Sequence, residues 1–172
     1  MQAVTHLLTG IVIQILCFMY FTLPLNIIFT IVFAFLSHFM VDAFAIVTYH
    51  TPEPQKGDRF WSAWIIIMIV GAFVLVIWLI IIGLFWFYFL GGFFAILVDI
   101  VDWGILRPIQ YKKKELDSKS IWEEGYYFHK LIAKFREKTL FWLPNWNYKR
   151  KGIIPEIIVI TALSLIVFFL IR

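Results

Sequence analysis

The stretch from Phe60 to Val98 contains no charged side chain, and this constrains the fold more than any other feature of the chain. A single helix of that length would measure about 57 Å, whereas the hydrocarbon core of a bilayer is about 30 Å thick. The segment must therefore fold back on itself. Because Gly83 lies near its middle and glycine tolerates turn geometry, we expect two membrane-spanning helices, at residues 62–82 and 85–105. A turn at Gly91–Gly92 is the alternative.

The composition of the whole chain also indicates a membrane protein. Of its 172 residues, 62% are hydrophobic and only 15% are charged, and the mean hydropathy is +0.88. Soluble domains contain about 45–50% apolar and about 25% charged residues. Since each span needs roughly 20 residues, five spans leave no room for a large soluble domain. We therefore predict an all-α fold, a polytopic transmembrane helical bundle in which residues 1–172 form a single domain.

Three further apolar segments complete the predicted bundle, at residues 4–21, 27–47 and 153–171. The sequence "TLPLN" separates the first two, because proline removes a backbone donor and asparagine favours turns. The first segment lacks the basic region and the cleavage pattern of a signal peptide, so we expect it to be a retained span. Its Cys17 is the only cysteine, which excludes an internal disulfide and a cysteine-based zinc site.

Most of the positive charge lies between the last two spans. Of the 15 lysines and arginines, 12 fall between residues 107 and 151. Residues 120–142 have apolar and basic side chains at helical spacing, which predicts an amphipathic helix at the membrane interface. The positive-inside rule places the N-terminus and the loop 106–152 in the cytoplasm and the C-terminus outside, in an inner or plasma membrane. Membrane lipids with anionic headgroups, and not nucleic acid, are the expected partners of this charge.

Five titratable side chains inside the predicted spans gather at one depth. His38 and Asp42 are four residues apart and share a helix face, and Asp99 and Asp102 are three residues apart. His6 lies near the start of the first span. In the predicted topology all five lie in the cytoplasmic half of the membrane. Because ionisable groups in a bilayer are costly unless they are paired, we expect these side chains to meet.

This combination of side chains is typical of a metal site. Two carboxylates without a cation repel each other unless one is protonated. Imidazole nitrogen and carboxylate oxygen are ligands of zinc, manganese and non-haem iron. We therefore predict a divalent metal, most simply zinc, held by His6, His38, Asp42 and Asp99. In the alternative interpretation, His38 and Asp42 form a hydrogen bond that only holds helices together.

Several short motifs carry a resemblance to a known family. They are "THLLTG" at 5–10, "FLSHFMVDAF" at 35–44, "TYH" at 48–50 and "AILVDIVDW" at 95–103, with "YYFHK" at 126–130 as a weaker match. Together they resemble the membrane-bound metal-dependent hydrolases, the group that includes the LexA-binding inner-membrane hydrolase type. The resemblance covers residues 1–105 and, more weakly, 120–135. One departure is Val98, where the family often has proline.

The resemblance implies a metal-dependent hydrolase and a set of functional residues. These are His6, His38, Asp42, His50, Asp99, Asp102 and, more weakly, His129. Beyond the metal ligands, it leaves His50, Asp102 and His129 as candidate catalytic residues, able to move protons or to border the site. The expected substrate is an ester or phosphoester, such as a lipid headgroup, at the cytoplasmic face.

Two other functions fit the same sequence. A non-enzymatic scaffold or lipid-binding membrane protein would use the His/Asp network structurally and would hold no stoichiometric metal. A proton or metal-ion transporter would need polar side chains through the full depth of the membrane. The outer half of the predicted bundle offers only Gln14, Asn26 and a few hydroxyl groups, which disfavours a through-path.

Overall fold

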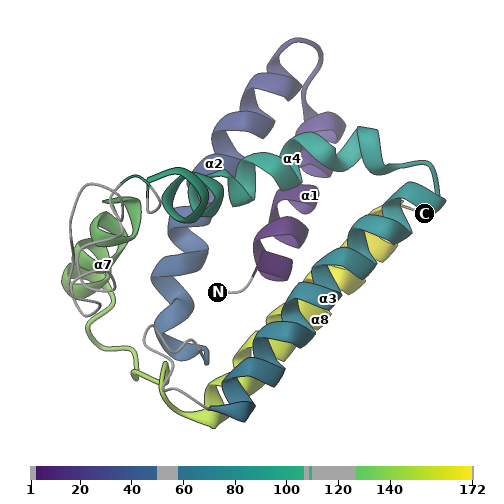
Figure 1. The fold of residues 1–172 in the computed structure, drawn as a ribbon. Coiled ribbons are helices and arrows are strands. Elements are labelled where there is room, and N and C mark those ends of the chain that lie inside the picture. The colour runs from purple at the N-terminus through teal and green to yellow at the C-terminus, as the bar shows by residue number, and fades with distance from the viewer. Residues whose placement is uncertain (1–2, 50–57, 107–108, 110–126, 172) are drawn as a thin grey trace.

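The computed structural model describes residues 3–49, 58–106, 109 and 127–171, and all regular structure in them is helical (Figure 1). The helices are α1 (Ala3–Tyr20), α2 (Leu25–Phe44), α3 (Arg59–Ile81), α4 (Phe85–Asp99), α7 (Tyr127–Thr139) and α8 (Ile153–Ile171). Short segments of tighter or wider winding adjoin them: η1 (Ala45–Val47), η2 (Ile100–Leu106) and η3 (Arg150–Gly152). Five helices are long and apolar enough to cross a membrane, which confirms the predicted fold class.

The division of the long uncharged stretch follows the sequence prediction. Gly83 has a φ of +74° between α3 and α4, a conformation that glycine adopts without steric cost. The alternative turn, Gly91–Gly92, instead lies inside α4. Helix α3 begins three residues earlier than expected because Asp58 caps it, accepting hydrogen bonds from the backbone N–H groups of Phe60 and Trp61 at 3.1 Å each.

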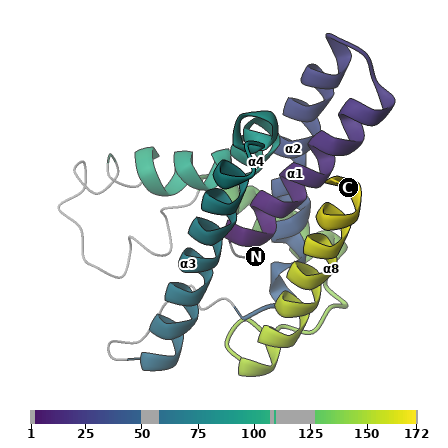
Figure 2. The same ribbon diagram turned by 90° about the vertical axis from the view of Figure 1, so that its right-hand side faces the viewer.

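Helix α1 is the centre of the bundle and contacts α2, α3, α4 and α8. Figure 2 shows α3 and α8 on opposite sides of the start of α1. A core cluster that includes Leu8, Ile11 and Ile15 of α1 packs with Leu79 of α3 and Val167 of α8. The central position of α1 explains why its polar residues are buried while α3 and α8 expose most of their apolar side chains.

Helices α1 and α4 meet through two glycines. A Cβ on Gly10 would overlap the carbonyl group of Gly91 and would lie 2.8 Å from the Ala95 Cβ, so only glycine permits this backbone contact. One turn further along α1, the Gln14 Oε1 accepts a hydrogen bond from the Gly91 N–H at 2.7 Å, and the Gln14 amide donates to the Phe87 carbonyl. The contact fixes the position of α4 relative to α1.

The amphipathic helix predicted at 120–142 is described only from Tyr127, and it ends at Thr139. It lies against α2 and η2 (Figure 1). Ile132 is buried in this contact, whereas Leu131 and Phe135 are 52% and 45% exposed. Part of the predicted apolar face therefore packs against the bundle, and part of it faces outward.

The glycine contact generates a test of the packing. Helix propensity alone favours alanine over glycine by about 1 kcal/mol, but overpacking a close contact costs about 1–3 kcal/mol. We therefore expect Gly10→Ala to lower the thermal unfolding midpoint in detergent. Gly71→Ala is the control, since the added methyl group would meet only Val4 Cγ2 at 3.4 Å. Equal midpoints for the two variants would contradict the contact.

Candidate metal centre

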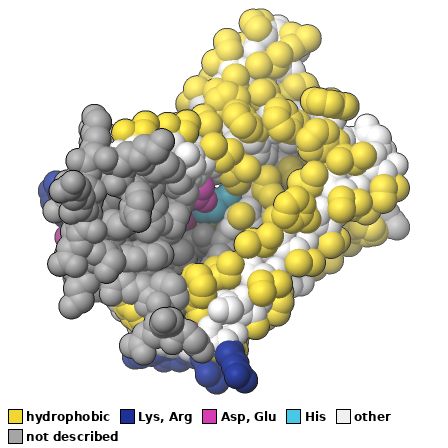
Figure 3. Space-filling view, viewed as in Figure 1, with side chains coloured by type: hydrophobic (Ala, Val, Ile, Leu, Met, Phe, Trp, Pro, Cys, Tyr) yellow, Lys and Arg dark blue, Asp and Glu magenta, His cyan; other side chains and the backbone are white. Residues whose placement is uncertain are grey.

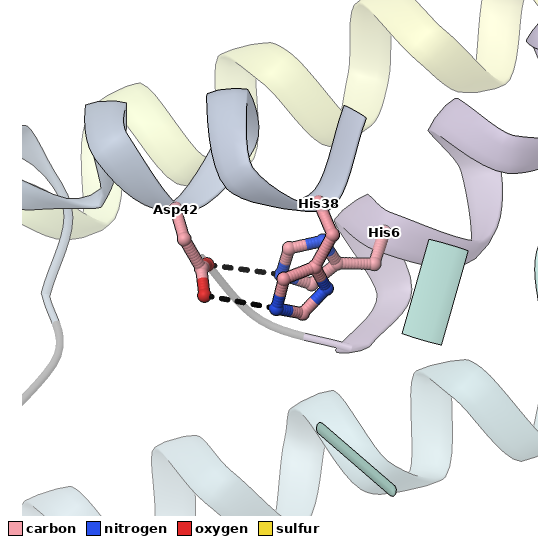
Figure 4. Close-up of side chains that lie close together, drawn as sticks. All are labelled: His6, His38 and Asp42. Atoms are coloured by element: carbon pink, nitrogen blue, oxygen red, sulfur yellow. Dashed lines mark hydrogen bonds and ion pairs between the residues drawn. The ribbon is translucent and has the colours of Figure 1, made fainter. Parts of the chain in front are cut away.

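Three buried side chains converge where the start of α1 meets the last turns of α2. His6 comes from the first turns of α1, and His38 and Asp42 come from the last two turns of α2. The His6 Nε2 lies 3.0 Å from Asp42 Oδ1, and the His38 Nε2 lies 3.2 Å from Asp42 Oδ2 (Figure 4). One carboxylate therefore faces two imidazoles at once.

The two imidazoles lie parallel to each other. Their ring centroids are 4.2 Å apart with an interplanar angle of 17°, and both Nε2 atoms point toward the Asp42 carboxylate (Figure 4). Both histidines are fully buried, and only 6% of Asp42 is exposed. His6, His38 and Asp42 can each supply a ligand atom with all three atoms within 4.8 Å of one another, which is a spacing that a single metal ion can bridge.

The backbone of α4 sets the tautomer of His38. Its Nδ1 lies 2.8 Å from the carbonyl oxygen of Ala95, and because a carbonyl can only accept, the Nδ1 must carry the proton. In the neutral ring the Nε2 then presents a lone pair to the Asp42 carboxylate, which also only accepts. A proton, carried by the ring or by the carboxyl group, or a metal ion can satisfy both atoms. An N–H to a backbone carbonyl is how metal-binding histidines are commonly oriented.

The acidic pair of the fourth span is divided between two environments. The Asp99 Oδ1 lies 3.8 Å from the His38 Nε2, and its side chain is 31% exposed. Asp102 is 1% exposed, and its Oδ2 accepts the Phe128 N–H of α7 at 3.2 Å. The chain is π-helical from Ile100, and this wider turn rotates each residue less than an α-helix does. Asp102 consequently contacts α7 while Asp99 stays beside His38.

The remaining two predicted residues have no described side chain. His50 lies outside the described residues, directly after the buried Tyr49. His129 lies on α7, one residue after Phe128, and nothing is described of its side chain. Their predicted catalytic roles therefore stay predictions.

Helix α7 covers this end of the bundle and is attached at both of its ends. Near its start, the Phe128 N–H bonds Asp102, and the Phe128 ring packs against Phe39 of α2 with centroids 6.1 Å apart. Two turns later, Arg136 Nη2 donates to the backbone carbonyl of Asp42 at 2.9 Å. Figure 3 shows acidic and histidine side chains at the bottom of a hollow whose described border is mostly apolar.

A second buried polar contact adjoins the site. The hydroxyl of Thr5, the residue before His6, donates to Glu156 Oε1 of α8 at 2.6 Å. Both residues are fully buried. Glu156, which the sequence places near the membrane boundary, thus joins α8 to the turn of α1 that carries His6.

Sequence reasoning did not identify three of these features. The Ala95 carbonyl belongs to the backbone, so no residue type signals it. Glu156 could have been found because a carboxylate in the first turns of an apolar span needs a partner. Arg136 could have been found from its spacing, since Phe128, Ile132 and Arg136 recur every four residues on one face of α7.

No protein-family model matches this chain, and no curated protein and no solved structure is significantly similar to it. The resemblance to the membrane-bound metal-dependent hydrolases therefore rests on the short motifs. Of the residues in those motifs, the structure brings together His6, His38 and Asp42, with Asp99 at the edge of the group.

The contact between Thr5 and Glu156 can be tested by removing one hydroxyl group. Thr5→Val keeps the shape of the side chain but removes this donor to Glu156, and one intramolecular hydrogen bond contributes roughly 0.5–1.5 kcal/mol to stability. We expect a lower unfolding midpoint in detergent for Thr5→Val and a midpoint near that of the wild type for Thr5→Ser, which retains the hydroxyl. If both variants lose stability equally, the hydrogen bond is not the cause.

Proposed function

We propose that this protein is a membrane-embedded, metal-dependent hydrolase that acts on an ester or phosphoester at the membrane surface. The observation that carries the proposal is the buried group of His6, His38 and Asp42, in which the Ala95 carbonyl turns the His38 Nε2 toward a carboxylate. Two imidazole nitrogens and a carboxylate are also the protein ligands of several catalytic zinc sites, which leave a further position open.

The three buried side chains would hold the metal. His38 is oriented by Ala95, and Asp42 is held by its position on the last turns of α2 and by the contact of Arg136 with its carbonyl. Manganese or iron would fit the same donors, although zinc suits a site with two imidazoles best. When bound, such a metal supplies a Lewis acid that polarises the scissile group and makes water acidic enough to react near neutral pH.

Asp99 is the residue best placed to move a proton. Its carboxylate lies beside His38 but outside the group of three, and it is partly exposed. A substrate or a water molecule that enters the hollow can therefore reach it, as a general base requires. Asp102, held by α7, would position the cover of the site, and His50 and His129 are candidates for the group that protonates the leaving group.

The location of the site supports a substrate at headgroup depth. His6 lies near the start of α1, Asp42 near the end of α2 and Asp99 at the end of α4, so the cluster lies near one end of the spans. We propose that this end faces the cytoplasm, because α7, which belongs to the basic segment 106–152, contacts α2 there and basic segments remain inside. The bilayer would then deliver lipid-linked esters or phosphoesters to the site.

Metal content is the decisive measurement. We expect elemental analysis of the detergent-purified protein to find about one transition-metal ion per chain, and we expect His38→Ala to lose it. Thr30→Val is the matched control, since Thr30 lies on the same helix, is equally buried and bonds only locally to the Asn26 carbonyl in the described contacts. A wild-type protein without metal, whose variants lose only stability, would indicate a structural His/Asp network.

The turnover of variants should distinguish the residues that bind the metal from the residue that accepts a proton. We expect the metal-loaded protein to hydrolyse a para-nitrophenyl ester or bis-para-nitrophenyl phosphate. Asp99→Asn should retain the metal but lower kcat by about 100-fold or more, since general-base catalysis contributes 10²–10⁴-fold. Loss of the metal from Asp99→Asn would instead make Asp99 the fourth ligand, as the sequence pattern predicts.

A further inference from the structure

Arg136 is a cationic side chain that contacts the backbone of Asp42, one of the three residues of the candidate metal centre. Its Nη2 donates to the backbone carbonyl of Asp42 at 2.9 Å, and the residue is half-buried between α7 and α2. Burial lowers the pKa of Arg136 below its ordinary value, while the nearby charge of Asp42 raises it. Because the ordinary value is so high, the guanidinium keeps its charge at neutral pH.

The contact with α2 does not use the whole guanidinium. The Asp42 carbonyl already accepts the backbone N–H of Ala45 as the helix ends. A guanidinium has five N–H donors in a rigid fork, and the Arg136 Nε is buried without a hydrogen-bond partner among the described residues. A lysine could satisfy one carbonyl equally well, so a helix cap alone does not explain an arginine at this position.

We infer that Arg136 is an anion-binding residue of this site and that the substrate class is therefore a phosphoester with a negatively charged phosphoryl group. This inference rests on the proposed function. The planar fork matches two oxygens of a phosphoryl group. A cation that faces the developing charge stabilises the transition state of phosphoryl-group reactions. A neutral carboxylic ester would match the Arg136 fork less well, and a site built to bond a group discriminates against substrates that lack it.

The position of α7 determines where this cation lies. Phe128 joins the start of the helix to Asp102, Ile132 is buried, and Arg136 follows on the same face over the last turn of α2. The guanidinium is therefore held by a helix that is itself attached to both acidic spans. Leu131 and Phe135 lie exposed on a neighbouring face, where they can contact the apolar chains of a lipid. The phosphoryl group that reaches Arg136 can therefore belong to a lipid headgroup, and a free phosphate is the alternative.

The test measures binding of inorganic phosphate to the metal-loaded, full-length protein in detergent by isothermal titration calorimetry. We expect Arg136→Gln to weaken phosphate binding by about 10- to 100-fold, the loss typical of hydrogen bonds to a charged group. Arg136→Lys, which keeps the charge and one donor for the Asp42 carbonyl, should lose less. Lys138→Gln is the control. Lys138 is exposed on the same helix, and its substitution removes the same charge.

A second arm replaces inorganic phosphate with a short-chain phosphatidate, and tighter binding of the phosphatidate identifies the lipid headgroup as the source of the phosphoryl group. The metal content of every variant is measured in parallel. Unchanged phosphate affinity in Arg136→Gln, with the metal retained, would overturn the inference and leave the proposed function intact. Equal weakening in Arg136→Gln and Lys138→Gln would also overturn it, because it would reduce the effect to net charge. A wild-type protein that holds no metal would instead refute the proposed function.

Discussion

The rest of the site depends on the contacts that the Asp42 carboxylate makes with two histidines. Its two oxygens face the imidazoles of His6 and His38, and its backbone carbonyl accepts a hydrogen bond from Arg136. One residue thereby links α1, α2 and α7. Within a membrane span there is little water to replace a lost partner, so a buried charge must be paired with protein groups or a bound cation. The need to satisfy Asp42 therefore constrains the placement of all three helices.

The glycine contact between α1 and α4 also helps to position His38. Gly10 and Gly91 allow the two backbones to touch, and from that point α4 carries the Ala95 carbonyl to the His38 Nδ1 one turn later. A larger residue at either glycine would move this carbonyl away from the ring. Helix packing and the tautomer of a buried histidine are therefore coupled, although neither glycine touches the site.

The sequence could predict those features that depend on hydropathy and helical spacing. The uncharged stretch required a turn, for which Gly83 was the better-centred position, and the depth of His6, His38 and Asp42 in their spans placed them at one level. It could not predict features that depend on the path of the backbone. The π-helical turn after Asp99 directs Asp102 to α7, and the carbonyl that orients His38 carries no residue-specific signal. Counting charges did not single out Arg136 among the other basic residues, although its spacing from Phe128 and Ile132 places it on the face of α7 that packs.

The geometry at His38 can be compared with the needs of a structural network and of a metal site. If the network is only structural, one proton between the His38 Nε2 and the Asp42 carboxyl group satisfies both atoms. Such a pairing stabilises helix association in a membrane only modestly, by about 0.6 kcal/mol on average for side-chain hydrogen bonds. Two stacked imidazoles sharing one carboxylate are not needed for that purpose. A divalent cation would take the His38 Nε2 and the Asp42 carboxylate as ligands at once, with the partly exposed Asp99 beside the same nitrogen.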